Sequence, residues 1–104
     1  MNLLPDRLRK TLPPLYSGEH NKDPIVYVKL FTPTSNYTWY ITEGSPEGND
    51  FILFGYVFGQ FGEWGYVSLN ELQSLGALVE RDLYFTSGLW SEVKARHYRD
   101  HGGE

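Results

Sequence analysis

Two histidines near the C-terminus are spaced so that they could bind a metal ion. His97 and His101 are four residues apart with Asp100 between them, which places both imidazoles on one face of a helix. A tetrahedral site needs a third protein ligand, and the pair lies close to a Gly-Gly-Glu end that is expected to fray. We therefore expect a solvated helix end here, without a metal site or a cofactor.

A second charged group is the run Glu80-Arg81-Asp82. In a strand, Glu80 and Asp82 share one face and Arg81 points to the other. Neighbouring carboxylates can raise the pKa of one of them, which would suit a general acid or base. Charged residues on a peripheral strand more often form ion pairs that protect the edge of a sheet, and this is the interpretation we prefer.

Three further carboxylates, Glu43, Asp50 and Glu63, fall in loops or at the ends of expected strands. Together with Glu80 and Asp82 they are candidates for an acidic rim around a sheet. No histidine, serine or lysine lies at a fixed offset from them, so the set specifies no reaction type. Solvation at the surface is the default interpretation, and a small enzyme that uses these carboxylates, alone or with a metal, is an alternative hypothesis.

The motifs that define a mechanism by themselves are absent. The chain has no phosphate-binding loop, no dinucleotide-binding glycine motif, no HExxH, no CxxC and no nucleophile elbow. Whether the protein is an enzyme stays open, and the missing motifs favour a binding function over catalysis.

Aromatic residues are the most conspicuous candidates for binding. Of the side chains expected on one face of a sheet, opposite Trp39, Trp64 and Tyr66, six are aromatic: Tyr27, Phe31, Tyr40, Phe54, Tyr56 and Phe58. If the helices cover only the other face, this one keeps a tyrosine-rich surface of the kind enriched at protein interfaces. The alternative is that three short helices divide between the two faces and cover both.

Composition limits the classes of partner. The 104 residues carry a formal charge of −4, without the excess of lysine and arginine with which proteins bind phosphate backbones, so nucleic acid is a disfavoured partner. No apolar run is long enough to span a membrane. Because the chain has no cysteine and no apolar segment of the kind that begins a secretory signal, we expect a cytoplasmic protein.

The elements that must position these residues can be read from the sequence. Residues 4–12 predict a short amphipathic helix. Residues 25–42 predict a hairpin in which Leu30 lies opposite Trp39. The stretch "FILFGYVFGQFGEWGYVSL" (51–69) predicts a second hairpin. A four-residue loop at 59–62 would place Tyr66 opposite Gly55 and Tyr56 opposite Gly65, so that each ring covers a glycine backbone.

The second half of the chain predicts two more helices and a strand. Ser68 and Glu71 fit a capping box for a short helix that Gly76 ends. Residues 78–85 predict a strand, and Ser87 or Ser91 could cap a last helix on which Trp90, Val93 and His97 share a face. The whole predicts one α+β domain over residues 1–104, with an antiparallel sheet of four to five strands built from two hairpins and three short helices.

Several ordered motifs resemble one bacterial family. They are "LPPLY", "VYVKLFTP", "TWYITEG", "DFILFGYV", "EWGYVSLNEL" and "ERDLYF". In this order they are similar to small proteins grouped as domain of unknown function 2958, and the resemblance runs from about Leu3 to Phe85. It implies a family-like core over residues 1–88, followed by a C-terminal helix and tail at 89–104. It also implies a setting on plasmids and other mobile genetic elements, but no catalytic residues.

These observations favour a non-enzymatic protein-interaction module with an unidentified protein partner. The setting implied by the resemblance suggests an accessory or anti-defence factor of a mobile element. A third hypothesis is an acidic mimic of nucleic acid, for which a charge of −4 over 104 residues is a weak basis. The oligomeric state is left open.

Overall fold

Two antiparallel hairpins form most of the sheet. The computed structural model describes residues 1–102 of the chain. Its elements follow in the order α1 (Asp6–Arg9), β1 (Ile25–Val26), β2 (Val28–Phe31), β3 (Thr38–Glu47), β4 (Asp50–Phe58), β5 (Glu63–Ser68), α2 (Leu69–Ser74), the 3-10 helix η1 (Gly76–Leu78), β6 (Glu80–Arg81), β7 (Gly88–Leu89) and α3 (Trp90–Asp100).

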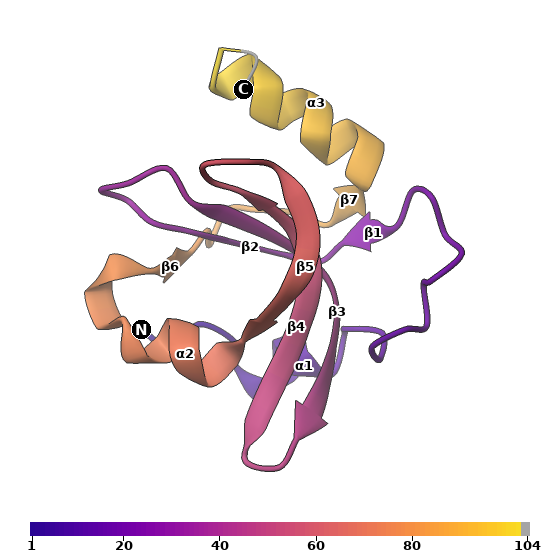
Figure 1. Ribbon diagram of the computed structural model, residues 1–104, viewed down its shortest axis with the longest axis vertical. Coiled ribbons are helices and arrows are strands. Elements are labelled where there is room, and N and C mark those ends of the chain that lie inside the picture. Colours follow the sequence, from indigo (N-terminus) through magenta and orange to yellow (C-terminus); the bar gives the residue numbers. More distant parts are fainter. Residues whose placement is uncertain (103–104) are drawn as a thin grey trace.

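The strands form one main sheet and one small one. The main antiparallel sheet has the order β5-β4-β3-β2-β6, and β1 pairs with β7 in a separate two-stranded sheet. Figure 1 shows the main sheet strongly twisted, with α3 lying apart from α1 and α2. This confirms the predicted single α+β domain. The predicted strand at 78–85 was largely wrong, because only Glu80–Arg81 pairs with β2 and the rest is helical turn or loop.

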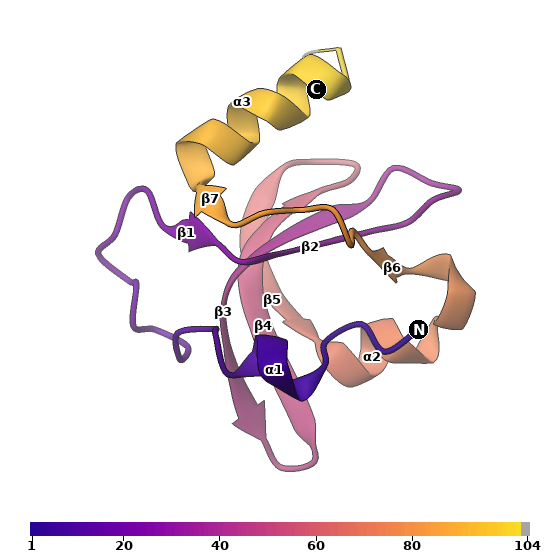
Figure 2. The same cartoon turned by 180° about the vertical axis from the view of Figure 1, so that it is seen from behind.

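One face of the sheet carries the larger aliphatic core. It packs against the N-terminal segment, α1 and α2, which lie close together in Figure 2. From α1 only the partly buried Leu8 packs against it. The buried residues of this core are Leu3, Leu4, Leu12, Val28, Leu30, Trp39, Ile41, Phe51, Leu53, Leu69, Leu72 and Val79. The N-terminus is tied to α2 by Gln73, whose side-chain oxygen accepts from the Leu3 amide at 3.0 Å.

The other face is covered in part by α3. Trp90 and Val93 of α3 pack against Val26, Tyr40 and Phe58, and all five side chains are buried. The predicted shared face of Trp90, Val93 and His97 is confirmed, since these are the buried residues of the helix. Both faces of the sheet are therefore covered at its centre, as the alternative interpretation of the aromatic content supposed.

The register of the first hairpin matches the prediction. Leu30 pairs with Trp39 and Val28 with Ile41, which places these side chains in the aliphatic core. Lys29 pairs with Tyr40 on the opposite face. A slip of one residue would have exchanged the two faces, so the hydrophobic pattern determines the pairing here.

The predicted register of the second hairpin was wrong by one residue. Gly55 pairs with Gly65, so neither glycine lies opposite a tyrosine, and Tyr56 pairs with Trp64. Five residues (58–62), and not four, separate the last paired residues, Val57 and Glu63. As a consequence, Trp64 and Tyr66 share a face with Phe54 and Tyr56 and do not oppose them.

Gly55 is required by a close approach of two strands. The pairing of β3 with β4 shifts between Ile41 and Glu43, which leaves Thr42 as the extra residue of a β-bulge. A Cβ atom at Gly55 would collide with the backbone carbonyl of Tyr40, whereas a Cβ atom at Gly65 would meet nothing within 4 Å. The two paired glycines therefore have different roles.

The helix ends agree only partly with the predictions. Ser68 caps α2, since its hydroxyl oxygen accepts from the Glu71 amide at 3.1 Å, and Gly76 follows the helix with φ of 59°. Neither Ser87 nor Ser91 caps α3. Its start is held instead by Asp23, whose carboxylate accepts from the Ser91 amide and hydroxyl, each at 2.7 Å. Within residues 1–102, no helix combines the length and apolar character needed to cross a bilayer.

Candidate functional site

Four aromatic rings line a groove beside the part of the sheet that α3 covers, and one of them, Trp64, contacts Trp90 of α3 with ring centroids 5.3 Å apart. We call it the aromatic groove and define it by Tyr16, Phe54, Trp64 and Tyr66. Phe54 comes from β4, Trp64 and Tyr66 come from the edge strand β5, and Tyr16 comes from the connection between α1 and β1. The groove encloses about 260 Å³.

The rings of the aromatic groove contact one another and solvent. The centroids of Phe54 and Tyr66 are 4.8 Å apart, and those of Tyr16 and Tyr66 are 6.0 Å apart. Phe54 and Trp64 stack at 5.7 Å with an angle of 12° between their planes. Tyr16, Trp64 and Tyr66 are nevertheless 62%, 39% and 55% exposed. Exposed rings in mutual contact are the composition expected of an interface.

Glu43 on β3 holds the Tyr16 loop against the sheet. One carboxylate oxygen accepts from the Tyr16 amide at 2.8 Å and the other accepts from the Gly18 amide at 2.9 Å. The Leu15 amide donates to the Ser45 hydroxyl at 2.9 Å. Tyr16 has φ of 72°, a conformation that costs a residue other than glycine about 1–3 kcal/mol. These hydrogen bonds maintain the strained backbone and so position the Tyr16 ring.

The aromatic groove has a negative electrostatic character. Glu43 is only 6% exposed, and no lysine, arginine or histidine within residues 1–102 forms an ion pair with it. Burial raises the pKa of Tyr66 above its ordinary value. The hydrogen bond with the Tyr16 side chain and the negative charges of Glu43 and Glu19 act in the same direction. A cation would therefore be favoured in this groove.

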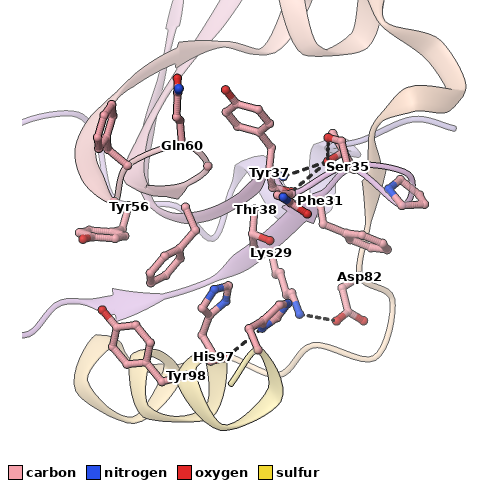
Figure 3. Close-up of a pocket in the computed structure, with 18 residues that line it drawn as sticks. Lys29, Phe31, Ser35, Tyr37, Thr38, Tyr56, Gln60, Asp82, His97 and Tyr98 are labelled. Atoms are coloured by element: carbon pink, nitrogen blue, oxygen red, sulfur yellow. Dashed lines mark hydrogen bonds and ion pairs between the residues drawn. The ribbon is translucent and has the colours of Figure 1, made fainter. Parts of the chain in front are cut away.

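A second, larger pocket lies between the tips of the two hairpins and α3 (Figure 3). We call it the histidine pocket and define it by Lys29, Asp82, His97 and His101, which are among the residues that line its volume of about 680 Å³. The Lys29 amine and the Asp82 carboxylate form an ion pair at 3.5 Å (Figure 3). This confirms for Asp82 the predicted role of a salt bridge near the edge of the sheet.

His97 is a buried residue, and the expectation that it would be solvated was wrong. It is 4% exposed, and its Nδ1 shares a hydrogen bond of 2.8 Å with the Tyr40 hydroxyl. Its ring stacks on Phe58 with centroids 3.7 Å apart. Burial, with the nearby charges of His101 and Lys29, lowers the pKa of His97 to about 4, so the ring is neutral at pH 7.

The two histidines share a helix face as predicted. Their rings stack 4.1 Å apart, and Nδ1 of His101 donates to the carbonyl oxygen of His97 at 2.9 Å. Among residues 1–102, no group of three or more histidine, aspartate or glutamate side chains is placed to hold a metal ion. The arrangement observed is thus a packed helix face.

The structure distributes the candidate carboxylates over separate sites. Asp50 lies at the start of β4, where its oxygens accept from the amides of Phe51 and Asn70 and from the Ser68 hydroxyl. These hydrogen bonds lower the pKa of Asp50, that from Ser68 most strongly.

The remaining acidic candidates do not form one rim. Glu63 lies on β5 and Glu80 lies on β6, the two opposite edge strands of the main sheet. Arg81, which follows Glu80 on β6, donates from its guanidinium to the carbonyl oxygens of Asn2 and Leu3, each at 2.9 Å. Of Glu43, Asp50, Glu63 and Glu80, only Glu43 lines a pocket described here.

The six candidate aromatic residues fall into four environments. Tyr40 and Phe58 are buried beneath α3. Phe31 and Tyr56 line the histidine pocket, and Phe54 lines the aromatic groove. Tyr27 packs against the aliphatic core on the other face.

The sequence did not identify three of the residues in the groove. Trp64 and Tyr66 were assigned to the wrong face by the one-residue error in register. Tyr16 stands in a turn-rich segment without periodicity, so only its contact with Tyr66 across the fold reveals it. If the second hairpin is assigned a five-residue loop, the register places Trp64 and Tyr66 on the same face as Phe54.

Comparison with known proteins gives a family but no activity. The family model described as protein of unknown function (DUF2958) matches residues 3–102. This match includes α3, whereas the resemblance read from the sequence motifs stopped at Phe85. No curated protein and no solved structure matches the chain. The chain therefore belongs to the DUF2958 family of proteins of unknown function.

Proposed function

We propose that this protein is a protein-interaction module that binds a partner protein through the aromatic groove. The observation that carries the proposal is the continuous row of ring contacts from Tyr16 through Tyr66 and Phe54 to Trp64. Tyr16, Tyr66 and Trp64 in this row are 39–62% exposed. Large rings are costly to leave in water, and tyrosine and tryptophan are enriched where one surface packs on another. Binding a partner would remove their exposed faces from water.

The position of the groove beside an edge strand favours the same function. Over the described part of the chain, β5 pairs only with β4 in the main sheet, so the strand that supplies Trp64 and Tyr66 to the groove is an edge strand. A partner that packs on Trp64 and Tyr66 would also cover this edge, which proteins generally protect. The edge and the rings thus form one continuous surface.

The alternative of a carboxylate-dependent enzyme is less well supported. Such an enzyme would be favoured by a deep pocket that gathers two of the candidate carboxylates Glu43, Asp50, Glu63 and Glu80. The histidine pocket contains none of the four, and the aromatic groove contains one. In the histidine pocket, His97 with a pKa near 4 is a weak base at pH 7.

The origin of the partner is a further part of the proposal. The resemblance to proteins encoded on mobile elements suggests a partner from the host, such as a component of a defence system, or one encoded by the element. Scattered carboxylates on two opposite edges give little support to a mimic of nucleic acid, since such a mimic needs its charges aligned along one surface.

The proposal can be tested by affinity capture from the native host with matched variants. A Trp64→Ala, Tyr66→Ala double variant removes two rings of the groove. A Leu83→Ala, Tyr84→Ala double variant removes two large side chains that are more exposed still and do not line it. We expect the first variant to recover at least tenfold less of a specific partner, while the second recovers as much as the unaltered protein. Circular dichroism verifies that both variants are folded. Equal recovery by both would contradict the assignment of the groove.

A further inference from the structure

We propose that the aromatic groove binds the guanidinium group of an arginine side chain presented by the protein partner. This inference rests on the function proposed above and deepens it by naming the chemistry that the groove recognises. It depends on the charge, the ring geometry and the size of the groove.

The charge of the groove is the first argument. Glu43 is a buried carboxylate, and among the residues that the structure describes its two oxygens accept only from the backbone amides of Tyr16 and Gly18. Within residues 1–102 it forms no ion pair, and Glu19 is a second carboxylate lining the same groove. Buried charges in proteins are normally paired. The ligand that completes this site is therefore a cation.

The carboxylate of Glu43 also has capacity left for a ligand. Each carboxylate provides about four lone-pair sites on its two oxygens, and the two amide hydrogen bonds occupy two of them. A guanidinium has five N–H donors in a planar fork that matches a carboxylate. Both oxygens of Glu43 can thus accept from one arginine without releasing the Tyr16 loop.

The rings favour arginine over lysine. Aromatic faces attract cations, and a planar guanidinium can stack on them, whereas an ammonium is a compact and strongly hydrated charge. Tyr66 lies between Tyr16 at 6.0 Å and Phe54 at 4.8 Å, with angles of 53° and 50° between the planes. Rings inclined to one another in this way present more than one face to a planar group between them.

The size of the groove agrees with a single side chain. Its volume of about 260 Å³ lies below the 300–1,000 Å³ typical of pockets for drug-sized ligands. It is therefore too small for a folded element of the partner and suited to one anchor residue. Interfaces commonly have such an anchor, and arginine is enriched among these residues.

The inference can be tested with small probes and NMR. Titration of the ¹⁵N-labelled protein with N-acetyl-arginine amide should give saturable shifts of the Trp64 indole N–H and of the Tyr16 and Gly18 amides. The indole signal of the buried Trp39, which lies in the aliphatic core on the other face, serves as the internal reference. N-acetyl-citrulline amide, which has the same shape without the charge, should bind at least tenfold more weakly, and the lysine analogue several-fold more weakly. Equal binding of the citrulline and arginine probes, or shifts confined to other sites, would overturn the inference.

Variants of the groove separate its two components. Tyr66→Leu removes a ring and Glu19→Gln removes a charge without touching the hydrogen bonds that hold the Tyr16 loop. We expect each to weaken arginine binding at least threefold, and Glu43→Gln to weaken it further. Glu47→Gln, at an exposed position outside the groove, should leave binding unchanged. If all four variants bind the arginine probe as the unaltered protein does, the proposed site is wrong.

The two proposals can fail separately. If a partner is captured through Trp64 and Tyr66 while the arginine probe shows no preference over citrulline, the interaction function stands and the arginine site falls. If the arginine probe binds the groove but no partner depends on Trp64 and Tyr66, the function falls and the cation site stands.

Discussion

The contact between Tyr40 and His97 shows how single residues complete the core beneath α3. Both side chains are polar, yet they are 3% and 4% exposed, and they satisfy each other with one hydrogen bond of 2.8 Å. An unsatisfied buried polar group costs about 1–3 kcal/mol. The pair therefore anchors the C-terminal half of α3 to the centre of the sheet.

Removal of the Tyr40 hydroxyl should destabilise the fold. Tyr40→Phe leaves Nδ1 of His97 without its partner, so we expect the free energy of unfolding to fall by about 1–3 kcal/mol. Tyr37→Phe is the matched control, because Tyr37 is exposed. This variant should change the free energy of unfolding by less than about 0.5 kcal/mol. Urea unfolding followed by circular dichroism measures both, and an equal effect in the two variants would contradict the structural role of the pair.

Stability should depend on pH through His97. Its pKa in the folded protein, about 4, lies below the value of 6.5 expected in the unfolded chain. The unfolded chain therefore binds the proton first as the pH falls, and stability is lost between about pH 6.5 and 4. This difference sets a ceiling of about 3 kcal/mol, which solvent in the adjoining histidine pocket reduces to about 1–2 kcal/mol.

A variant isolates this contribution from those of the carboxylates. His97→Gln removes the titrating group, so its free energy of unfolding should fall less than that of the unaltered protein between pH 7 and 4.5. Urea unfolding at a series of pH values provides the comparison. Parallel pH profiles for the two proteins would show that His97 does not titrate as described.

At the scale of the element, the register of the second hairpin determines where the aromatic groove forms. This register aligns Phe54 with Tyr66 and Tyr56 with Trp64, so that four rings share one face. The bulge in β3 at Thr42 lets Glu43 pair with Phe54 and line the same groove. The acidic and aromatic components of the site therefore depend on the pairing of β3, β4 and β5.

Two paired glycines provide a test of this hairpin. Gly55→Ala places a Cβ atom against the Tyr40 carbonyl, and we expect a loss of about 2–3 kcal/mol in the free energy of unfolding. Gly65→Ala meets nothing within 4 Å and should be neutral or stabilise by up to about 1 kcal/mol, since glycine weakens a strand. Thermal unfolding of both variants measures the difference. Equal losses would favour the alternative register, in which each glycine faces a tyrosine.

The sequence predicted elements better than their alignment. Apolar spacing identified both hairpins and the buried face of α3, because burial of one face imposes a period on the chain. The same spacing could not predict the number of residues in the loop of the second hairpin. Rings occur on both faces of β4 and β5, so either register buries some of them. The connection of residues 10–24 has no period at all, so its docking by Glu43 became visible only in three dimensions.

At the scale of the whole molecule, the two faces of the sheet are used differently. One face is an aliphatic core under α1 and α2. The other is aromatic, and α3 covers Tyr40 and Phe58 and extends as far as Tyr56 and Trp64, which Trp90 contacts. The aromatic groove begins at Trp64, where this coverage ends. The fold class followed from composition and periodicity, but the limit of α3's coverage depends on tertiary packing and could not be predicted.

The central claim is that a protein partner contacts the aromatic groove, and site-specific crosslinking tests it most directly. A photoreactive phenylalanine analogue is introduced in place of Tyr66 and, in a separate protein, in place of Tyr84, which is 94% exposed and lies outside the groove. After irradiation in the native host, we predict a specific crosslinked protein from position 66 and none from position 84. A crosslink from position 84 alone, or the same product from both positions, would contradict the account.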